Sequence, residues 1–491
     1  MIRRYWILVS LFLLPAALRA QINDAETEKV EQYFQKIRGT ESELIAFCSG
    51  MPKGGDLHHH FTGAIYAEDL FETAKKSNFF VSNDSLFIYP QRPPQEHTRD
   101  TSIYQFSDAR VDPNIRNRLV SFWSCKDFVP GNEAPDYHFF QAFGRFGPAV
   151  NGGQVLYYAA MKTRAVIEHL SYIETMLARP YFDRGYKTFV SVAMKYDSLL
   201  IPAGQTRDTS VALPLLRQAL KTLASDTGFM AFARTHRTSI DAFSRLSVLP
   251  PSIDTLVTVR FLNYASRTSP PTDVLGQLLL SFASCDDSVL LGVNIVAPEN
   301  DTTSMRDYWL HMQMFALLHK MYPKVPYTLH AGELTRGLVK PEDLTWHIRS
   351  ALGDAGANRI GHGVDMPYET DNKQLLDYMS TRHIPIEINL TSNEFILGVK
   401  DDRHPFPLYY EHHVPIVIST DDPGILRTSI TEQFVALAKR YNFVTYKDIK
   451  EFTYNSIRYS FLLPKVKSNL VAKLDKAFAR WEASEVPPAV R

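Results

Sequence analysis

Three consecutive histidines begin the part of this chain that could do chemistry. The segment Asp56-Leu57-His58-His59-His60 lies at the end of a predicted strand. Alternate side chains of a strand point to the same face, so His58 and His60 can project together. Two converging imidazoles form half of a binding site for a zinc-like metal ion.

Histidines and carboxylates that could complete such a site occur much later in the chain. His330 lies three residues before Glu333, and His362 stands between two glycines. Asp421 and Asp422 directly follow an apolar run. Each group lies near the end of a predicted strand. A metal-dependent hydrolase on a β/α barrel needs this placement, because barrel active sites lie at the carboxyl ends of the strands.

Each of these motifs has a simpler explanation when it is taken singly. A run of histidines can be an exposed polar segment, and a single histidine such as His330 is more often a buried, hydrogen-bonded residue. Asp422 before Pro423 favours a turn or a helix N-cap. The metal-site hypothesis therefore rests on the coincidence of all these groups at predicted strand ends.

The elements that must position these residues alternate along the chain. Strands are predicted at 54–60, 171–177, 257–264, 289–297, 326–331, 358–362, 384–390 and 415–420, with helices between most of the later ones, including 304–321, 341–352, 371–382 and 429–440. Such alternation implies a parallel sheet. Eight strands close a barrel, so the predicted fold class is α/β, a (β/α)₈ TIM-type barrel.

The chain of 491 residues is longer than the roughly 250 residues of a minimal barrel. We therefore predict additional segments: a signal peptide at 1–20, an N-terminal helical extension at 21–50, and an insertion at 78–135 after the first strand, within a barrel at 51–485. The insertion is rich in Pro, Asn, Asp and Ser, and no helix is predicted in it. Further helices are predicted at 153–169 and 211–236, and a strand outside the main sheet at 186–194.

Composition excludes several classes of function. Lys+Arg and Asp+Glu number 53 each, so no electrostatic argument favours a nucleic-acid partner. The three cysteines, Cys48, Cys125 and Cys285, include no C-x-x-C pair, which disfavours a thiolate zinc site. They allow at most one disulfide within the chain, and the sequence leaves open whether any two of them pair.

The first 20 residues are typical of an export signal. Arg3 and Arg4 precede an apolar core from Tyr5 to Leu14, which is shorter than the ~20 residues that span a bilayer. Leu18-Arg19-Ala20 offers a cleavage site before Gln21. We therefore expect a secreted or periplasmic protein that is free of the membrane after cleavage.

Four short motifs stand in a fixed order between residues 51 and 425. They are M-P-K-G-G-D-L-H-H-H at 51–60, H-A-G-E at 330–333, R-I-G-H-G at 359–363 and S-T-D-D-P at 419–423. Together they resemble the motifs of the adenosine deaminase family of metal-dependent amidohydrolases. The Met-Pro-Lys-Gly start and the export signal are most similar to the secreted, growth-factor-related branch of that family.

The resemblance implies a role for each matching residue. The residues that would bind Zn²⁺ are His58, His60, His330 and Asp421. Glu333 would be the proton shuttle, and His362 would position the attacking water. Those that would contact the substrate are Asp422, Gly332 and Ala297. Two positions depart from the family pattern: Thr62 stands where many members have an acid that meets the ribose, and Ala297 stands at the place of a glycine.

Hydrolytic deamination explains why these residue types are needed. Water is a weak nucleophile at neutral pH, and zinc can lower its pKa from about 15.7 to about 7. A protonated Glu333 could give its proton to ring N1 and then assist the departure of ammonia. His362 could orient the hydroxide and stabilise developing negative charge.

The leading hypothesis is an exported, zinc-dependent adenosine deaminase that converts adenosine or 2′-deoxyadenosine to the inosine product and ammonia. One alternative is a deaminase of another 6-aminopurine compound, and another is a secreted binding or signalling protein on a deaminase scaffold. A cytidine-deaminase type is disfavoured because its H-x-E and P-C-x-x-C pattern is absent. The expected partner is a small-molecule purine nucleoside, and the oligomeric state stays open, a homodimer included.

The signal-peptide hypothesis predicts a mature chain that begins near Gln21. The charged start, the short apolar core and the small residue at position 20 are the physical reasons. N-terminal sequencing of material from outside the cytoplasm checks this, and intact Met1 in soluble cytoplasmic protein would contradict it.

Overall fold

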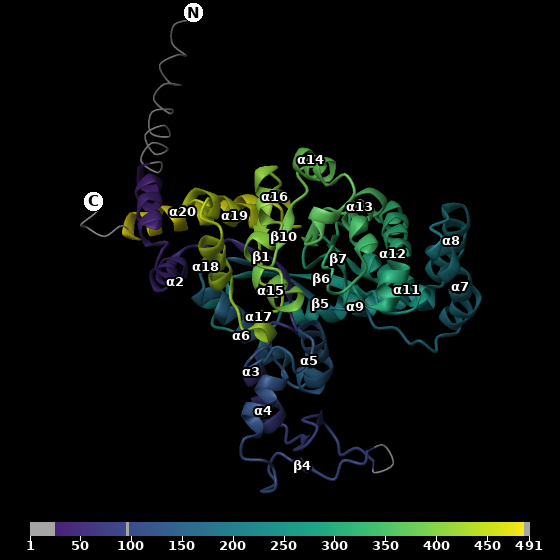
Figure 1. The fold of residues 1–491 in the computed structure, drawn as a ribbon. Helices are drawn as coiled ribbons and strands as arrows, with labels where there is room; N and C mark the ends of the chain where they lie inside the picture. Colours follow the sequence, from purple (N-terminus) through teal and green to yellow (C-terminus); the bar gives the residue numbers. More distant parts are fainter. Residues whose placement is uncertain (1–24, 95–97, 486–491) are drawn as a thin grey trace, which may run out of the picture.

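The structure is a computed structural model that describes residues 25–94 and 98–485 (Figure 1). The predicted signal peptide at 1–20 lies outside these residues. Within the two described ranges, no helix is long and apolar enough to cross a membrane. The three cysteines are all free thiols in this structure.

Eight parallel strands form the centre of the molecule, and they confirm the predicted fold class. They are β1 Gly55–His60, β5 Tyr172–Ala178, β6 Thr258–Ser266, β7 Leu290–Val296, β8 Thr328–Ala331, β9 Arg359–His362, β10 Ile386–Ile388 and β11 Ile416–Ile418. The strand orders are β1-β5-β6-β7 in one sheet and β11-β10-β9-β8 in the other. Each predicted strand of the barrel coincides with one of them.

Short parallel bridges connect the two sheets at both seams. His60 N–H donates to Asp421 O at 2.9 Å, and Asp421 N–H donates to His58 O at 2.8 Å. At the other seam, Val293 N–H donates to Pro326 O at 3.2 Å. The eight strands therefore surround one core. The first seam also places the end of β11 beside the histidines of β1.

Helices connect the strands and cover the outside of the sheets (Figure 1). After β1 come α3 Ala67–Lys76, α4 Ile115–Phe122, α5 Pro135–Val150 and α6 Gln154–Ile167. The middle crossovers use α7 Lys187–Gln205, α8 Thr209–Ser225, α9 Thr227–Ser244, α10 Pro251–Asp254, α11 Pro271–Ser284, α12 Thr302–Met321, α13 His347–Ser350, α14 Asn372–Arg382, α15 Leu390–Leu397 and α16 Phe406–Glu411. The chain ends with α17 Pro423–Leu426, α18 Ile430–Arg440, α19 Tyr446–Arg458 and α20 Pro464–Glu485.

Burial patterns explain why these residues form these elements. The strands β10 and β11 are fully buried, as expected for strands with helices on one face and a barrel core on the other. In α11, 13 of 14 residues are buried. The reason is that α11 packs on β6 and is itself covered by α7 and α9.

The predicted strand at 186–194 is wrong, because this segment begins α7. Its β-branched and aromatic residues suggested a strand, but the buried positions are Phe189, Val192, Tyr196 and Leu200. Their spacing of three to four residues is that of a helix face. The segment therefore packs as part of the outer helical layer.

The segment 78–135 contains more structure than its composition suggested. It includes a small antiparallel sheet of β2 Phe80–Ser82, β3 Ile88–Tyr89 and β4 Ile103–Gln105. It also contains α4, which contradicts the prediction that no helix occurs there. Ile115, Leu119 and Val120 bury one face of α4. In Figure 1 this segment extends below the barrel as a separate lobe.

Two other predicted helices differ in detail from the structure. The stretch 341–352 is divided into η2 Pro341–Thr345, α13 and the beginning of η3 Ala351–Ala355. Near the start of the chain, a helix at 25–37 and α2 Glu41–Gly50 replace a single surface helix. Because α2 packs on α18, this region lies beside the C-terminal helices.

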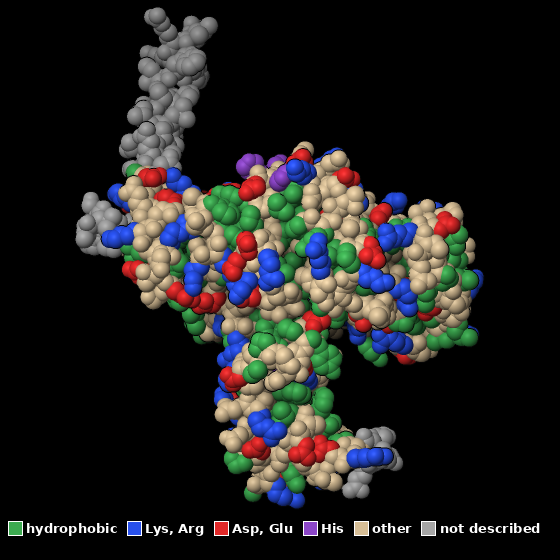
Figure 2. Space-filling model, in the orientation of Figure 1, with side chains coloured by type: hydrophobic (Ala, Val, Ile, Leu, Met, Phe, Trp, Pro, Cys, Tyr) green, Lys and Arg blue, Asp and Glu red, His purple; other side chains and the backbone are tan. Residues whose placement is uncertain are grey.

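Figure 2 shows both signs of charge interspersed over the visible face of the molecule.

Candidate active site

Four candidate metal ligands converge where β1, β8 and β11 end. The Nε2 atoms of His58 and His60 lie 3.0 and 3.2 Å from Nε2 of His330. Asp421 Oδ1 lies 3.5 Å from the first of these histidines and 3.3 Å from the second. All four ligand atoms lie within 4.8 Å of one another, so the structure brings together the residues that the sequence predicted.

The hydrogen bonds behind the rings decide which nitrogen atoms carry protons. Nδ1 of His58 lies 2.7 Å from Glu387 Oε2, and Nδ1 of His330 lies 3.0 Å from Asn294 Oδ1. Both oxygen atoms accept, so both Nδ1 atoms donate, and in the neutral form of each ring Nε2 carries the lone pair.

Two lone pairs 3.0 Å apart repel each other unless a cation lies between them. A proton can serve one pair of nitrogen atoms, whereas a metal ion can serve all four donors. Three imidazoles and a carboxylate form a donor set typical of zinc. The residues therefore fit a bound metal ion.

Glu387, which contacts Nδ1 of His58, belongs to a buried network of charged residues. Arg359 lies 2.5 Å from Glu387 and 2.5 Å from Glu174. Burial opposes the ionisation of Glu387, but Arg359 and His58 outweigh it and lower its pKa to about 2. A Cβ on Gly361 would lie 2.6 Å from Cε1 of His58, so only glycine leaves room for the ring. The motif at 359–363 therefore supplies both a charge partner and space.

Asp421 is held from the neighbouring α15. Ser392 Oγ donates to Asp421 Oδ2 at 2.6 Å. Burial opposes the charge of Asp421, but the hydrogen bond with His60 and the nearby histidines lower its pKa overall. A charged carboxylate is the form that a metal ligand needs.

Glu333 is buried and lies 3.6 Å from Nδ1 of His362 through its Oε1 atom. Burial, followed by the negative charges of Asp421 and Glu299, raises the pKa of Glu333 well above its usual value. This shift favours the protonated form of Glu333. This is the state that a general acid requires.

The backbone before Glu333 is held by a second buried acid. Glu299 accepts from Gly332 N–H at 3.1 Å and from Glu333 N–H at 3.0 Å. Arg267 forms an ion pair with Glu299 at 3.3 Å, and Nδ1 of His347 lies within hydrogen-bond distance of Glu299 at 2.6 Å. Gly332 is not among the residues that line the cavity described next, and its N–H is already bonded.

A cavity of about 410 Å³ opens beside the candidate ligands. Its lining residues are His60, Thr62, Phe139, Phe140, Gln141, Phe143, Met176, Tyr264, Thr268, Val296, Ala297, Pro298, Asp301, His330, Glu333, His362, Asp421 and Asp422. The aromatic residues of α5 form an apolar wall that the sequence did not predict. Of the predicted substrate contacts, Asp422 and Ala297 lie on the wall of this cavity.

Asp422 and Ala297 are each in an unusual state. Burial and the adjacent Asp421 raise the pKa of Asp422 well above its usual value, and its Oδ1 has no hydrogen-bond partner among the described residues. Ala297 has φ of 84°, in the left-handed region that favours glycine. This backbone geometry explains why a glycine at this place suits the family pattern.

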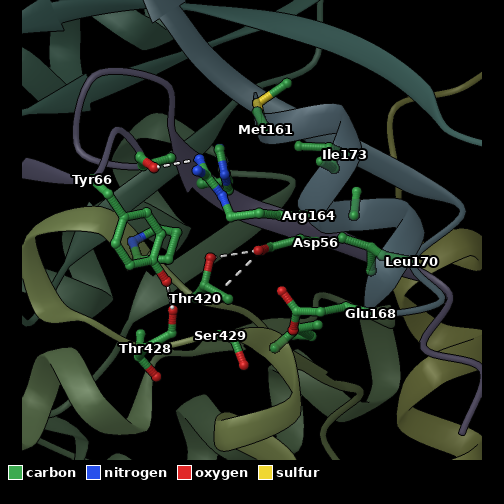
Figure 3. Close-up of a pocket in the computed structure, with 15 residues that line it drawn as sticks. Asp56, Tyr66, Met161, Arg164, Glu168, Leu170, Ile173, Thr420, Thr428 and Ser429 are labelled. Atoms are coloured by element: carbon green, nitrogen blue, oxygen red, sulfur yellow. Dashed lines mark hydrogen bonds between the residues drawn. The ribbon is translucent and has the colours of Figure 1, made fainter. Parts of the chain in front are cut away.

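A second, smaller cavity lies on the outer side of β1 (Figure 3). Its volume is about 40 Å³, and Asp56, Tyr66, Arg164 and Thr420 are among its lining residues. Thr420 donates to Asp56 through both its hydroxyl and its N–H. None of the four candidate ligands lines this cavity, so the chemistry is expected in the larger one.

Several residues of this site carried no signal in the sequence analysis. These are Glu299, Glu387, Ser392, Asn393 and Asn294, which contact the predicted residues from other strands and helices. Each is a polar residue in or shortly after an apolar strand, a feature that could have drawn attention to it. Its partner, however, lies tens to hundreds of positions away and is not visible in the chain.

Comparison with known proteins gives the family. A family model described as adenosine deaminase matches residues 232–477, so the chain belongs to the adenosine deaminase family of metal-dependent amidohydrolases. An adenosine deaminase from Clostridium acetobutylicum is 27% identical over 198 residues, which are 40% of this chain and 54% of that protein.

Other relatives carry different substrate names. An aminodeoxyfutalosine deaminase from Streptomyces coelicolor is 31% identical over 32% of this chain and 37% of its own length. An N6-methyl-AMP deaminase from Xenopus laevis is 32% identical over 24% of this chain and 33% of its own length. The matched stretches thus span about a third to a half of these relatives.

Solved structures share the fold at lower identity. The N6-methyl-AMP deaminase from Arabidopsis thaliana superposes with a TM-score of 0.54 at 17% identity, covering 89% of this chain and 99% of that one. An amidohydrolase from Burkholderia ambifaria with bound Zn has a TM-score of 0.50 at 16% identity, covering 90% and 94%. These similarities establish the barrel fold.

The metal-site geometry predicts that His330→Ala loses its metal ion and its activity together. His330 supplies the nitrogen atom that lies nearest to both other histidines, so its removal leaves an incomplete donor set. His311→Ala is the matched control, because His311 is also buried and lies outside the donor set. Elemental analysis of both purified, folded variants checks this, and full metal retention by His330→Ala would contradict it.

Proposed function

We propose that this protein is an exported, zinc-dependent deaminase of 6-aminopurine nucleosides, with adenosine as its first substrate and 2′-deoxyadenosine as its second. The observation that carries the proposal is the cluster of four metal donors, three of which line one cavity together with Glu333 and His362. Membership in the adenosine deaminase family supports the reaction class.

The proposed metal ligands are His58, His60, His330 and Asp421. A bound zinc ion would supply a Lewis acid that lowers the pKa of water to about 7. His362 is neutral, because burial lowers its pKa to about 3, and it lies beside Asp421. It would hold the attacking oxygen through a hydrogen bond.

Glu333 and Asp422 would act on the purine ring. A protonated Glu333 donates to a ring nitrogen, which makes the carbon that bears the amine more electrophilic, and later passes a proton to the departing ammonia. Asp422, whose raised pKa favours the protonated form and whose Oδ1 has no hydrogen-bond partner among the described residues, would bind a second ring nitrogen. Two protonated acids in one cavity suit a flat heterocycle with several acceptor nitrogens.

The composition of the cavity favours a nucleoside over a nucleotide. No lysine or arginine in the described parts of the chain lines this cavity, whereas Asp301, Glu333, Asp421 and Asp422 do. A phosphate would therefore find no cationic side chain on this wall to pair with. None of the lining residues comes from the described parts of 78–135, namely 78–94 and 98–135, so these parts offer no basic group to the cavity wall.

The acid–base role predicts that Glu333→Gln keeps its metal ion and loses at least ~10²-fold in kcat, because the amide keeps the size of the side chain but cannot transfer a proton. Glu369→Gln is the matched control, since Glu369 is also buried and has a pKa raised to about 7 by burial, yet it lies outside the cavity. Steady-state kinetics at equal metal content decides. A nearly unchanged kcat would remove Glu333 from the mechanism.

The substrate proposal predicts similar kcat/KM for adenosine and 2′-deoxyadenosine and much lower values for AMP and N6-methyl-AMP. Thr62 offers a neutral hydroxyl to the sugar, worth roughly 1 kcal/mol or less. Measuring kcat/KM for these four compounds and 5′-deoxyadenosine tests the proposal. A strong preference for either monophosphate would overturn the nucleoside assignment, and a large penalty for 5′-deoxyadenosine would assign the sugar contact to a residue other than Thr62.

A further inference from the structure

A chain of three hydrogen bonds runs from the backbone to the ring of His362. Phe406 N–H lies 3.0 Å from Nδ1 of His404, and Nε2 of His404 lies 3.1 Å from Asn393 Oδ1. Asn393 Nδ2 then lies 3.0 Å from Nδ1 of His362. The three side chains are between 0 and 2% exposed, so water does not compete for these bonds.

The backbone end of the chain fixes the direction of every bond. A backbone N–H can only donate, so Nδ1 of His404 must accept from Phe406. A neutral imidazole has one donor and one acceptor, which leaves Nε2 of His404 as the donor to Asn393 Oδ1. Burial, helped by the charge of Arg440, lowers the pKa of His404 to about 3 and keeps it neutral.

The same logic continues to the active site. Because Asn393 Oδ1 accepts from His404, the amide must present its N–H₂ group to His362. Nδ1 of His362 therefore accepts, and the ring proton resides on Nε2. This Nε2 atom lies 4.0 Å from Asp421 Oδ2 and has no hydrogen-bond partner among the described residues.

The histidines that contribute to the metal cluster have the opposite arrangement. Nδ1 of His58 faces the carboxylate of Glu387, and Nδ1 of His330 faces the carbonyl oxygen of Asn294. Acceptors behind these rings leave their Nε2 lone pairs free for a metal ion. The donor behind His362 instead leaves an N–H there. A histidine with an acceptor at Nδ1 can thus bind a metal ion through Nε2, whereas a histidine with a donor at Nδ1 offers an Nε2–H group.

We propose that Asn393 and His404 are positioning residues that hold His362 in its Nε2–H tautomer, so that it offers a hydrogen-bond donor to the attacking oxygen and no lone pair to the metal. Neither residue lines the cavity. The catalytic consequence rests on the proposed function, whereas the tautomer itself does not.

The direct test is the protonation pattern of His362 in protein with ¹⁵N-labelled histidine, read from long-range ¹H–¹⁵N spectra. A His362→Gln variant identifies the signals. We expect a proton on Nε2 and none on Nδ1 in the natural chain. In Asn393→Asp, which replaces the donor by an acceptor of the same size, Nδ1 should gain a proton. A proton on Nδ1 in the natural chain, or an unchanged pattern in Asn393→Asp, would overturn the proposal.

Kinetics supply a second readout at equal metal content. Asn393→Asp is expected to lower kcat at least ~10²-fold with KM near its original value, since a wrong histidine tautomer in a serine protease costs about 10⁴-fold. Asn263→Asp is the matched control, because Asn263 is buried and its Oδ1 accepts from His236 at 2.7 Å, outside the cavity. Equal kcat values for the two variants would contradict a positioning role.

Variants of His404 keep the test decisive if Asn393→Asp does not fold. His404→Leu removes the donor to Asn393 Oδ1 and allows the amide to turn, so kcat should fall. His404→Gln restores an N–H donor and should recover part of the loss. Equal kcat in both variants would contradict the relay. A natural chain without deaminase activity would refute the proposed function alone, because the ¹⁵N spectra still decide the tautomer.

Discussion

The site at the carboxyl end of this barrel depends on one constraint: Nε2 of His58 and Nε2 of His330 lie 3.0 Å apart in a buried space, and both can be satisfied only by a proton or a metal ion between them. The surrounding structure must hold the two rings at this distance. The seam between β1 and β11 does so through the backbone, since hydrogen bonds join His58 and His60 to Asp421. Gly361 does so by leaving room for the ring of His58.

The balance of buried charge separates structural acids from chemical ones. Glu387 and Glu299 are each paired with a buried arginine and with hydrogen-bond donors, and the pKa of each is lowered to about 2. Among the described residues, neither an arginine nor a lysine forms an ion pair with Glu333 or Asp422, and burial raises the pKa values of both acids. Two acids whose burial favours the protonated form on a cavity wall suit a reaction on a ring with acceptor nitrogens.

Strain is concentrated at the same strand ends. Ala297, His362 and Asp421 follow or end β7, β9 and β11, and all three have positive φ although none is glycine. Such conformations cost of order 1–3 kcal/mol each and persist where the surroundings determine them. Here the surrounding hydrogen bonds are those of Asn393 to His362 and of Ser392 to Asp421, both from the first turn of α15. The positive φ values of His362 and Asp421 therefore accompany side chains that both lie at the candidate metal site.

The sequence by itself determined the eight strands, the family and the residues that meet at the metal cluster. Local signals sufficed for these, because apolar runs and histidines at strand ends are adjacent in the chain. It failed at 186–194, where β-branched residues suggested a strand but the burial of Phe189, Val192 and Tyr196 is that of a helix face.

Only the tertiary structure decided the hydrogen-bond partners behind the histidine rings. Glu387 lies 329 positions from His58 and Asn393 lies 31 positions from His362, and no local pattern links such pairs. Those partners decide which nitrogen carries a proton, and hence which histidine can bind a metal ion and which can donate a hydrogen bond.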